Sequence, residues 1–338
     1  MYYANNDVRL EERRKPKAGP GELLVRIEAS GICGTDCMEW YRIHRVPLIL
    51  GHEIAGTVVE RGRGVTKYKV GDRVVASHHV PCGTCRYCKS GHKTVCDLLR
   101  ATNFDPGGFC EFVRIPKINT KNGVYLIPKN VSFDEATFAE PLACVLRGQR
   151  LARVKNGDTV LVLGSGLAGI LHLQMAKYHG AKNLVATDVS EYRLRMAKRL
   201  GAKSVFHARE YTPELLKKLN EGRLADIVIV CAGAASACEQ ALRSVERGGT
   251  ILFFAATGKG VTVPLSINDI FWRNEITLTS SYAATPEEHV EALRLISSRK
   301  IDVRAMISHI FGLAETGRGF ALVSEAKDSM KVIIKPQE

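Results

Sequence analysis

The sequence predicts an α/β protein in which a doubly wound parallel sheet is inserted into a mostly β domain. Three observations support this prediction. Short apolar segments between turn residues continue to about residue 140, a strand–helix alternation begins near residue 158, and the pattern changes again after Tyr282. A chain of 338 residues is long enough for two domains. We expect residues 1–143 and 284–338 to form one domain and residues 144–283 to form the other.

The first part of the chain is expected to be mostly β. Residues 23–29, 54–60 and 73–76 alternate in polarity or are continuously apolar, and Gly and Pro residues lie between them. Segments of this kind are typical of short strands in an antiparallel domain.

The middle of the chain is expected to form the parallel sheet. Strands are predicted at 159–163, 184–187, 204–207, 227–230, 250–254 and 276–280. Helical stretches such as 167–179 and 190–200 separate several of them. Strands linked by helical crossovers favour a doubly wound parallel sheet.

The last part begins with a helix signal. Residues 285–288, with the sequence TPEE, form a capping box with Pro at the first helical position. Val290, Leu293 and Ile296 then form one apolar stripe. We expect this segment to pack back on the first domain.

The overall composition excludes several classes of protein. The net charge of +13 could suit an anionic partner, but the Lys and Arg residues are scattered among Glu and Asp, so we expect no nucleic-acid partner. The most apolar stretch, 160–175, contains three glycines and polar residues, so no membrane span is expected. No secretory signal is visible at the N-terminus, and a cytoplasmic location is expected. Ten cysteines in such a chain favour metal binding over a disulfide framework.

Four cysteines have the spacing of a metal ribbon. The pattern C-x2-C-x2-C-x7-C is formed by Cys82, Cys85, Cys88 and Cys96. Four thiolates in a Gly-rich loop can surround one Zn²⁺ and leave no position for water, so the site is expected to be structural. An iron–sulfur cluster, a nucleic-acid-binding ribbon and accidental spacing are the alternatives.

A second set of potential metal ligands is spread along the chain. Cys33, His52 and Glu140 offer a thiolate, an imidazole and a carboxylate, which suit a catalytic zinc with one position open. No local spacing connects them. Each also has an ordinary interpretation, as a buried thiol, a core histidine and an acid at a helix N-terminus.

A glycine loop follows the strand predicted at 159–163 and precedes a helix. Gly164, Gly166 and Gly169 form G-x-G-x-x-G, and with Leu167 they are expected to bind a pyrophosphate at the helix N-terminus. Asp188 lies nineteen positions after Gly169, about where a carboxylate binds the adenosine ribose, and its charge favours NAD over NADP. Arg193 is either an adenosine contact or a partner for a 2′-phosphate. A tight turn without a nucleotide is the alternative.

The order of the motifs resembles that of the zinc-dependent medium-chain dehydrogenases. CGTD at 33–36, GHE at 51–53, the four-cysteine ribbon, GDRV at 71–74 and the glycine loop occur in this order along nearly the whole chain. The carboxylate Glu140 resembles the sorbitol (polyol) and threonine dehydrogenase branch. This resemblance implies a GroES-like catalytic domain, a Rossmann domain, two zinc ions per subunit, NAD, and a homodimer or homotetramer.

The resemblance also implies roles for individual residues. Cys33 and His52 would ligate the catalytic zinc, with Glu53 and Glu140 as direct, water-mediated or exchanging ligands. Asp36 would orient His52, and Thr35 would hold the substrate hydroxyl and pass on its proton. Cys37 and Cys144 are alternative ligands.

The sequence departs from the family pattern at two positions. Met38 stands where relatives commonly have a relay histidine, so His44 or water is expected to take that role. Arg147 stands where relatives often have histidine, and it is either a contact for an anionic group or a surface or helix-pair residue. Asn103, Phe104 and residues 280–282 are expected to line the pocket by analogy with the family.

These features predict an alcohol dehydrogenase that oxidises a secondary hydroxyl of a small polyol, sugar or cyclitol. Zinc would lower the pKa of the hydroxyl, and a hydride would pass to NAD. A threonine-type amino-alcohol dehydrogenase and a non-catalytic NAD-sensing zinc protein are the alternatives.

Overall fold

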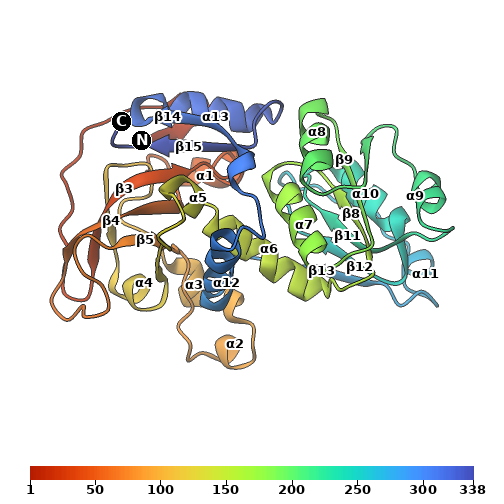
Figure 1. Cartoon of the computed structure of the whole chain (residues 1–338), viewed down its shortest axis with the longest axis horizontal. Coiled ribbons are helices and arrows are strands. Elements are labelled where there is room, and N and C mark those ends of the chain that lie inside the picture. Colours follow the sequence, from red (N-terminus) through yellow and green to blue (C-terminus); the bar gives the residue numbers. More distant parts are fainter. The chain divides into compact units, whose positions relative to one another are not determined.

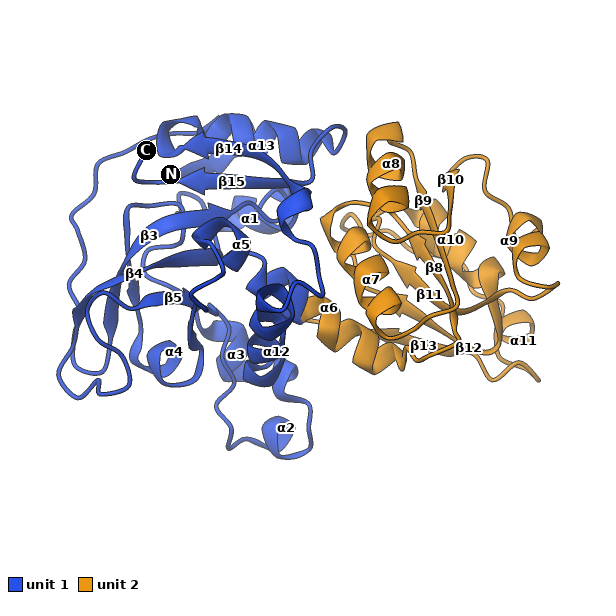
Figure 2. Cartoon of the chain, viewed as in Figure 1, with its two compact units in different colours: residues 1–143, 283–338 blue, residues 144–282 orange.

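The computed structural model describes all 338 residues, which divide into two compact units (Figure 2). Residues 1–143 and 283–338 form the first unit, and residues 144–282 form the second. Each unit has its own buried apolar clusters. None of the helices combines the length and the apolar sequence that crossing a lipid bilayer requires.

The second unit is built on a six-stranded parallel sheet with the order β10-β9-β8-β11-β12-β13 (Figures 1 and 2). Its strands are β8 (Thr159–Leu163), β9 (Asn183–Asp188), β10 (Ser204–His207), β11 (Ala225–Val230), β12 (Val245–Phe253) and β13 (Thr277–Ser280). Between them come helices α7 (Leu167–Tyr178), α8 (Glu191–Leu200), α9 (Pro213–Leu219), α10 (Ala235–Ser244) and α11 (Ile267–Ile270). All residues of β8 are buried, as in a parallel strand covered on both faces. The predicted parallel sheet is confirmed.

The first unit contains a seven-stranded sheet of the order β14-β15-β3-β4-β5-β7, with β6 also paired to β3. Its strands are β3 (Leu23–Gly31), β4 (Glu53–Arg61), β5 (Arg73–Ala76), β6 (Phe112–Ile115), β7 (Val124–Leu126), β14 (Ile307–Gly312) and β15 (Lys331–Lys335). All pairs are antiparallel except β14 with β15. Strands β1 (Tyr2–Ala4) and β2 (Asp7–Val8) pair separately.

Mostly short helices complete the first unit. They are α1 (Glu39–Arg42), α2 (Arg86–Lys89), α3 (Asp97–Ala101), α4 (Lys117–Asn122), α5 (Phe133–Ala136), α12 (Pro286–Ser297) and α13 (Thr316–Glu325), with 3-10 turns η1 (Ile43–Arg45), η2 (Lys93–Val95), η3 (Arg304–Met306) and η4 (Leu313–Glu315). Helix α6 (Ala139–Ala152) begins in the first unit and ends in the second. Helix α12 starts with the predicted capping box, in which the Thr285 amide donates to Glu288 Oε2 at 2.6 Å.

A buried carboxylate in α5 forms ion pairs with the C-terminal segment of the first unit. Glu135 in α5 is 1% exposed and pairs with Arg299, which follows α12, and with Arg304 in η3. Its other oxygen accepts a hydrogen bond of 2.8 Å from the Ser132 amide. Because a buried carboxylate is costly unless it is paired, this cluster fixes the C-terminal segment against α5.

We predict that Glu135→Ala lowers the stability of the protein by about 1–3 kcal/mol, because it removes the buried acceptor of the Ser132 amide and of the two arginines and leaves a cavity. Thermal unfolding followed by circular dichroism measures the effect. Glu315→Ala is the matched control, since Glu315 pairs with Arg318 on the surface, where such pairs contribute little. Equal midpoints for the two variants would contradict the prediction.

Candidate functional site

Cys33 and His52 are neighbours because strands β3 and β4 pair antiparallel. Gly31, the last residue of β3, lies opposite Glu53, the first residue of β4. Cys33 and His52 therefore flank the same end of the strand pair, although they are nineteen positions apart in sequence. The ligand atoms of Cys33, His52 and Glu53 all lie within 4.8 Å of one another. A thiolate, an imidazole and a carboxylate at this separation can share one Zn²⁺.

A buried lysine holds Glu53. Lys331, the first residue of β15, donates from Nζ to Glu53 Oε2, and both side chains are fully buried. Gly31 makes room for the pair, since a Cβ there would lie 2.2 Å from Glu53 Oε2. The second oxygen, Oε1, is buried and has no hydrogen-bond partner. An unpaired buried carboxylate oxygen beside a thiol and an imidazole is what a cation would satisfy, so the residues fit zinc.

Asp36 orients the ring of His52. Its Oδ1 lies 3.3 Å from His52 Nδ1, and its Oδ2 accepts from the Cys33 amide at 3.1 Å. Burial opposes the charge on both groups. Even so, the attraction to His52 and to Arg42, which lies 3.8 Å away, lowers the pKa of Asp36. The attraction to Asp36, with a smaller contribution from Cys33, raises the pKa of His52 well above its ordinary value. Because Nδ1 faces Asp36, Nε2 is the nitrogen available to a metal.

Of the residues near Cys33 in the sequence, Thr35 lies beside the metal group, whereas Cys37 points into an apolar cluster. Thr35 is exposed, and its hydroxyl donates to Cys33 Sγ at 3.3 Å, so it lies beside the metal group. Cys37 instead packs in an apolar cluster with its Sγ 3.8 Å from the Phe320 carbonyl, and burial raises its pKa to about 12. Met38 precedes α1, and His44 is exposed in η1.

The residues predicted on α6 are not part of the three-residue group. Glu140 is half-buried in the first turn of α6, and Cys144 follows one turn later. Arg147 is 5% exposed, so it is not a surface residue.

Sequence reasoning missed two histidines at this site. His78 and His79 follow β5, and the ring centroid of His78 is 4.8 Å from that of His52 and 3.8 Å from that of His79. Burial lowers the pKa of His78 well below its ordinary value and that of His79 to about 4, so both rings are neutral at neutral pH. The available signal was a pair of histidines between a strand and the cysteine ribbon.

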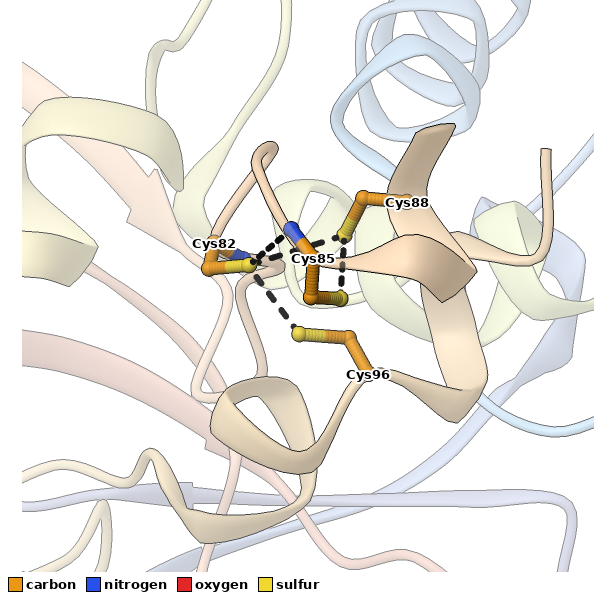
Figure 3. A group of neighbouring side chains, drawn as sticks. All are labelled: Cys82, Cys85, Cys88 and Cys96. Atoms are coloured by element: carbon orange, nitrogen blue, oxygen red, sulfur yellow. Dashed lines mark hydrogen bonds between the residues drawn. The ribbon is translucent and has the colours of Figure 1, made fainter. Parts of the chain in front are cut away.

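The four ribbon cysteines converge on one point (Figure 3). The Cys85 and Cys88 sulfurs are 3.6 Å apart, and those of Cys82 and Cys88 are 3.9 Å apart. Four sulfurs bound tetrahedrally at about 2.3 Å from zinc are separated by about 3.8 Å. Hydrogen bonds from the Thr84 hydroxyl and from the Thr84 and Cys85 amides lower the pKa of Cys82 to about 5, which favours the thiolate that zinc requires.

The glycine loop of the second unit needs its small residues. A Cβ on Gly169 would lie 2.0 Å from the Gly164 carbonyl oxygen, and Gly164 has φ +97°. At Gly166, before the first residue of α7, Leu167, the nearest atom to a Cβ would be Arg193 Nη1 at 3.7 Å. The helix N-terminus therefore stays open to an anionic group.

Asp188 ends β9 beside this loop. Its carboxylate accepts hydrogen bonds from the Ser165 amide at 2.7 Å and the Ser190 amide at 2.9 Å. The side chain is thus fixed with its negative charge next to the loop.

Two family models match the chain. The alcohol dehydrogenase GroES-like domain matches residues 19–129, and the zinc-binding dehydrogenase model matches residues 168–298.

Individual proteins match over nearly their whole length. The chain is 31% identical to sorbitol dehydrogenase of Gallus gallus, covering 97% of this chain and 93% of the relative. It is 30% identical to L-threonine 3-dehydrogenase of Caldanaerobacter subterraneus subsp. tengcongensis, covering 99% and 97%. Among solved structures, a zinc-binding dehydrogenase of Sinorhizobium meliloti bound to NADP has a TM-score of 0.87 at 30% identity and covers 99% and 97%.

We predict that Cys82→Ser lowers the zinc content from about two ions per chain to about one, because only the ribbon loses a ligand. The unfolding midpoint should fall by about 5–15 °C, since structural zinc stabilises the folded ribbon. Elemental analysis and calorimetry measure both effects. Cys110→Ser, at a half-buried cysteine outside both groups, should change neither. Full zinc content in the Cys82 variant would refute the ribbon site.

We also predict that zinc binding to the metal-free first site releases a proton from His52. Its raised pKa keeps the ring protonated at neutral pH, whereas a ligand must be neutral, so the apparent affinity falls as the pH is lowered. Calorimetry in buffers of different ionisation enthalpy counts the protons. The Asp36→Asn variant should release about one proton fewer per zinc ion bound, because it lacks the main negative charge that raises the pKa of His52. Equal proton release by both proteins would contradict this.

Proposed function

The chain belongs to the zinc-dependent medium-chain dehydrogenase family, and we propose that it oxidises a secondary hydroxyl of a polyol, sugar or cyclitol to a ketone with NAD. The observation that carries the proposal is the group of Cys33, His52 and Glu53, which offers three ligands and leaves a tetrahedral ion one position for substrate. A purely structural site would be filled by the protein, as in the ribbon.

The two bound groups divide the chemistry between them. Zinc at the three-ligand group supplies a Lewis acid that lowers the pKa of a substrate hydroxyl, and the nicotinamide accepts a hydride from the carbinol carbon. Each oxidation thus removes two electrons and one proton with the hydride, and the hydroxyl proton leaves to solvent.

The residues around the metal group have separate tasks in this proposal. Thr35, whose hydroxyl is 3.3 Å from Cys33 Sγ, would hold the substrate hydroxyl and pass its proton on toward solvent, accepting one proton as it donates its own. Asp36 fixes the orientation of His52, and Lys331 fixes Glu53. Glu140 at the start of α6 is proposed as an exchanging or water-mediated ligand.

Asp188 supports NAD as the cofactor. Its carboxylate is fixed next to the glycine loop, where it would repel a 2′-phosphate. Arg193 lies beside Gly166 and is proposed as an adenosine contact. The Sinorhizobium relative holds NADP, so the nucleotide preference needs a direct comparison.

A threonine dehydrogenase is the second candidate, because a relative of that activity is 30% identical over 99% of the chain. An amino-acid substrate brings an ammonium group, which needs an acidic partner. Asp36 is already paired with His52 and Arg42, and Glu53 is paired with Lys331. This favours a neutral polyhydroxylated substrate.

We predict that the wild-type protein reduces NAD with at least one of sorbitol, galactitol, an inositol or a simple secondary alcohol. With the same substrate, it should reduce NAD faster than it reduces NADP. Cys33→Ser should lower kcat by about 10³-fold or more because it removes a zinc ligand, yet bind NAD normally. NADH absorbance measures turnover, and fluorescence titration measures NAD binding.

Cys37→Ser is the matched control in the same loop and should retain turnover, because Cys37 packs away in an apolar cluster. Turnover with threonine alone would favour the second candidate. NAD binding without turnover on any alcohol would instead support an NAD-sensing protein. A fully active metal-free protein would refute the zinc role.

A further inference from the structure

We propose that His78 hydrogen-bonds the hydroxyl adjacent to the one being oxidised, and so selects vicinal diols over mono-alcohols. This inference rests on the proposed function and deepens it by naming a substrate class. It is carried by three features of the first unit, which are a fixed backbone, a ring beside the metal group, and a ring nitrogen without a partner.

The backbone that carries His78 is held rigidly. Fully buried Asn119 donates from Nδ2 to the carbonyls of Ser77 and His78 at 3.0 and 2.9 Å. On the other side of the turn, the Val80 amide donates to Thr102 Oγ1 at 3.1 Å. A side chain presented from such a turn is already in position before substrate binds, which is the property a specificity group requires.

The ring of His78 lies directly beside the metal group. It is 4.8 Å from the ring of His52 and 6.1 Å from the ring of buried Phe104, measured between centroids. If a zinc ion held by Cys33, His52 and Glu53 takes a substrate hydroxyl as its open ligand, the carbons next to that hydroxyl would lie near the ring of His78.

The two adjacent histidines differ in their hydrogen bonding. His79 Nδ1 is 3.1 Å from the Thr102 carbonyl oxygen, so that ring is satisfied by the protein. His78 Nδ1 is buried without a partner. Buried polar atoms in native structures are normally satisfied, and an exception calls for a ligand or another specific explanation.

A hydroxyl is the partner that matches a neutral imidazole. The ring offers one donor and one acceptor, and a hydroxyl can both donate and accept. A mono-alcohol leaves the His78 nitrogen unpaired, whereas a vicinal diol pairs it. Sites built to hydrogen-bond a substrate hydroxyl discriminate strongly against analogues that lack it.

The test compares propane-1,2-diol with propan-2-ol, which differ by one hydroxyl, in the zinc-loaded enzyme with NAD. His78→Phe keeps a ring of similar shape but removes its hydrogen bonds. We expect the diol-to-alcohol ratio of kcat/KM to fall by about 10–100-fold, mainly through the diol. His78→Asn and His78→Gln keep a polar atom near Nδ1 and Nε2, and at least one should restore part of the ratio.

His179→Phe is the matched control, because His179 follows the C-terminal end of α7 in the second unit and is not part of the metal group, and it should leave the ratio unchanged. Zinc content is measured for every variant. A wild type that does not prefer the diol overturns the inference. So does a His78→Phe variant whose kcat/KM falls equally on both substrates or on neither. Absence of any alcohol oxidation by the wild type would instead defeat the proposed function itself, and this inference with it.

Discussion

The antiparallel pairing of β3 with β4 is the constraint on which the first site depends. Its register sets Gly31 opposite Glu53, so the ends of the two strands bring Cys33 and His52 together. Strand β15 joins β3 on its other side and carries Lys331 to the same place. A side chain at residue 31 would occupy the space of the Glu53 carboxylate. The metal group is thus a property of the sheet rather than of any single loop.

The buried carboxylates near this strand end are each paired with a positively charged or ionisable side chain. One carboxylate oxygen, Glu53 Oε1, has no partner, and a cation would satisfy it. Glu53 is paired with Lys331, and Asp36 is paired with His52 and Arg42, all with little exposure of the carboxylates. Such pairing offsets the cost of burying charge. It also fixes the ligands before metal binds, with Glu53 Oε1 buried and unpartnered and with His52 Nδ1 facing Asp36, so that Nε2 is the ring nitrogen left for a metal.

The sequence predicted best those features whose residues lie close together along the chain. The cysteine ribbon and the glycine loop are encoded within short segments, so spacing alone predicted where their residues converge. Cys33 and His52 were identified by type and by resemblance, but only strand pairing brings them together. Lys331 was missed because a lysine in an apolar strand has no local signature, and His78 was missed because the histidine pair before the ribbon does not show which residues it will lie beside. Glu140 was predicted as a ligand from the resemblance. Because α6, the helix that carries Glu140, lies far from Cys33 and His52 in the sequence, spacing could not predict the distance of its carboxylate from them.

The most direct measurement is a crystal structure of the zinc-loaded protein with data collected on both sides of the zinc absorption edge. Two anomalous peaks per chain are expected. One would lie at the centre of the four ribbon cysteines. The other would lie about 2.0–2.3 Å from Cys33 Sγ and His52 Nε2, with a coordination position not taken by the protein. No peak beside Cys33 and His52 would contradict a zinc site there, and an ion enclosed by four protein ligands other than the exchangeable Glu140 would contradict an open coordination position.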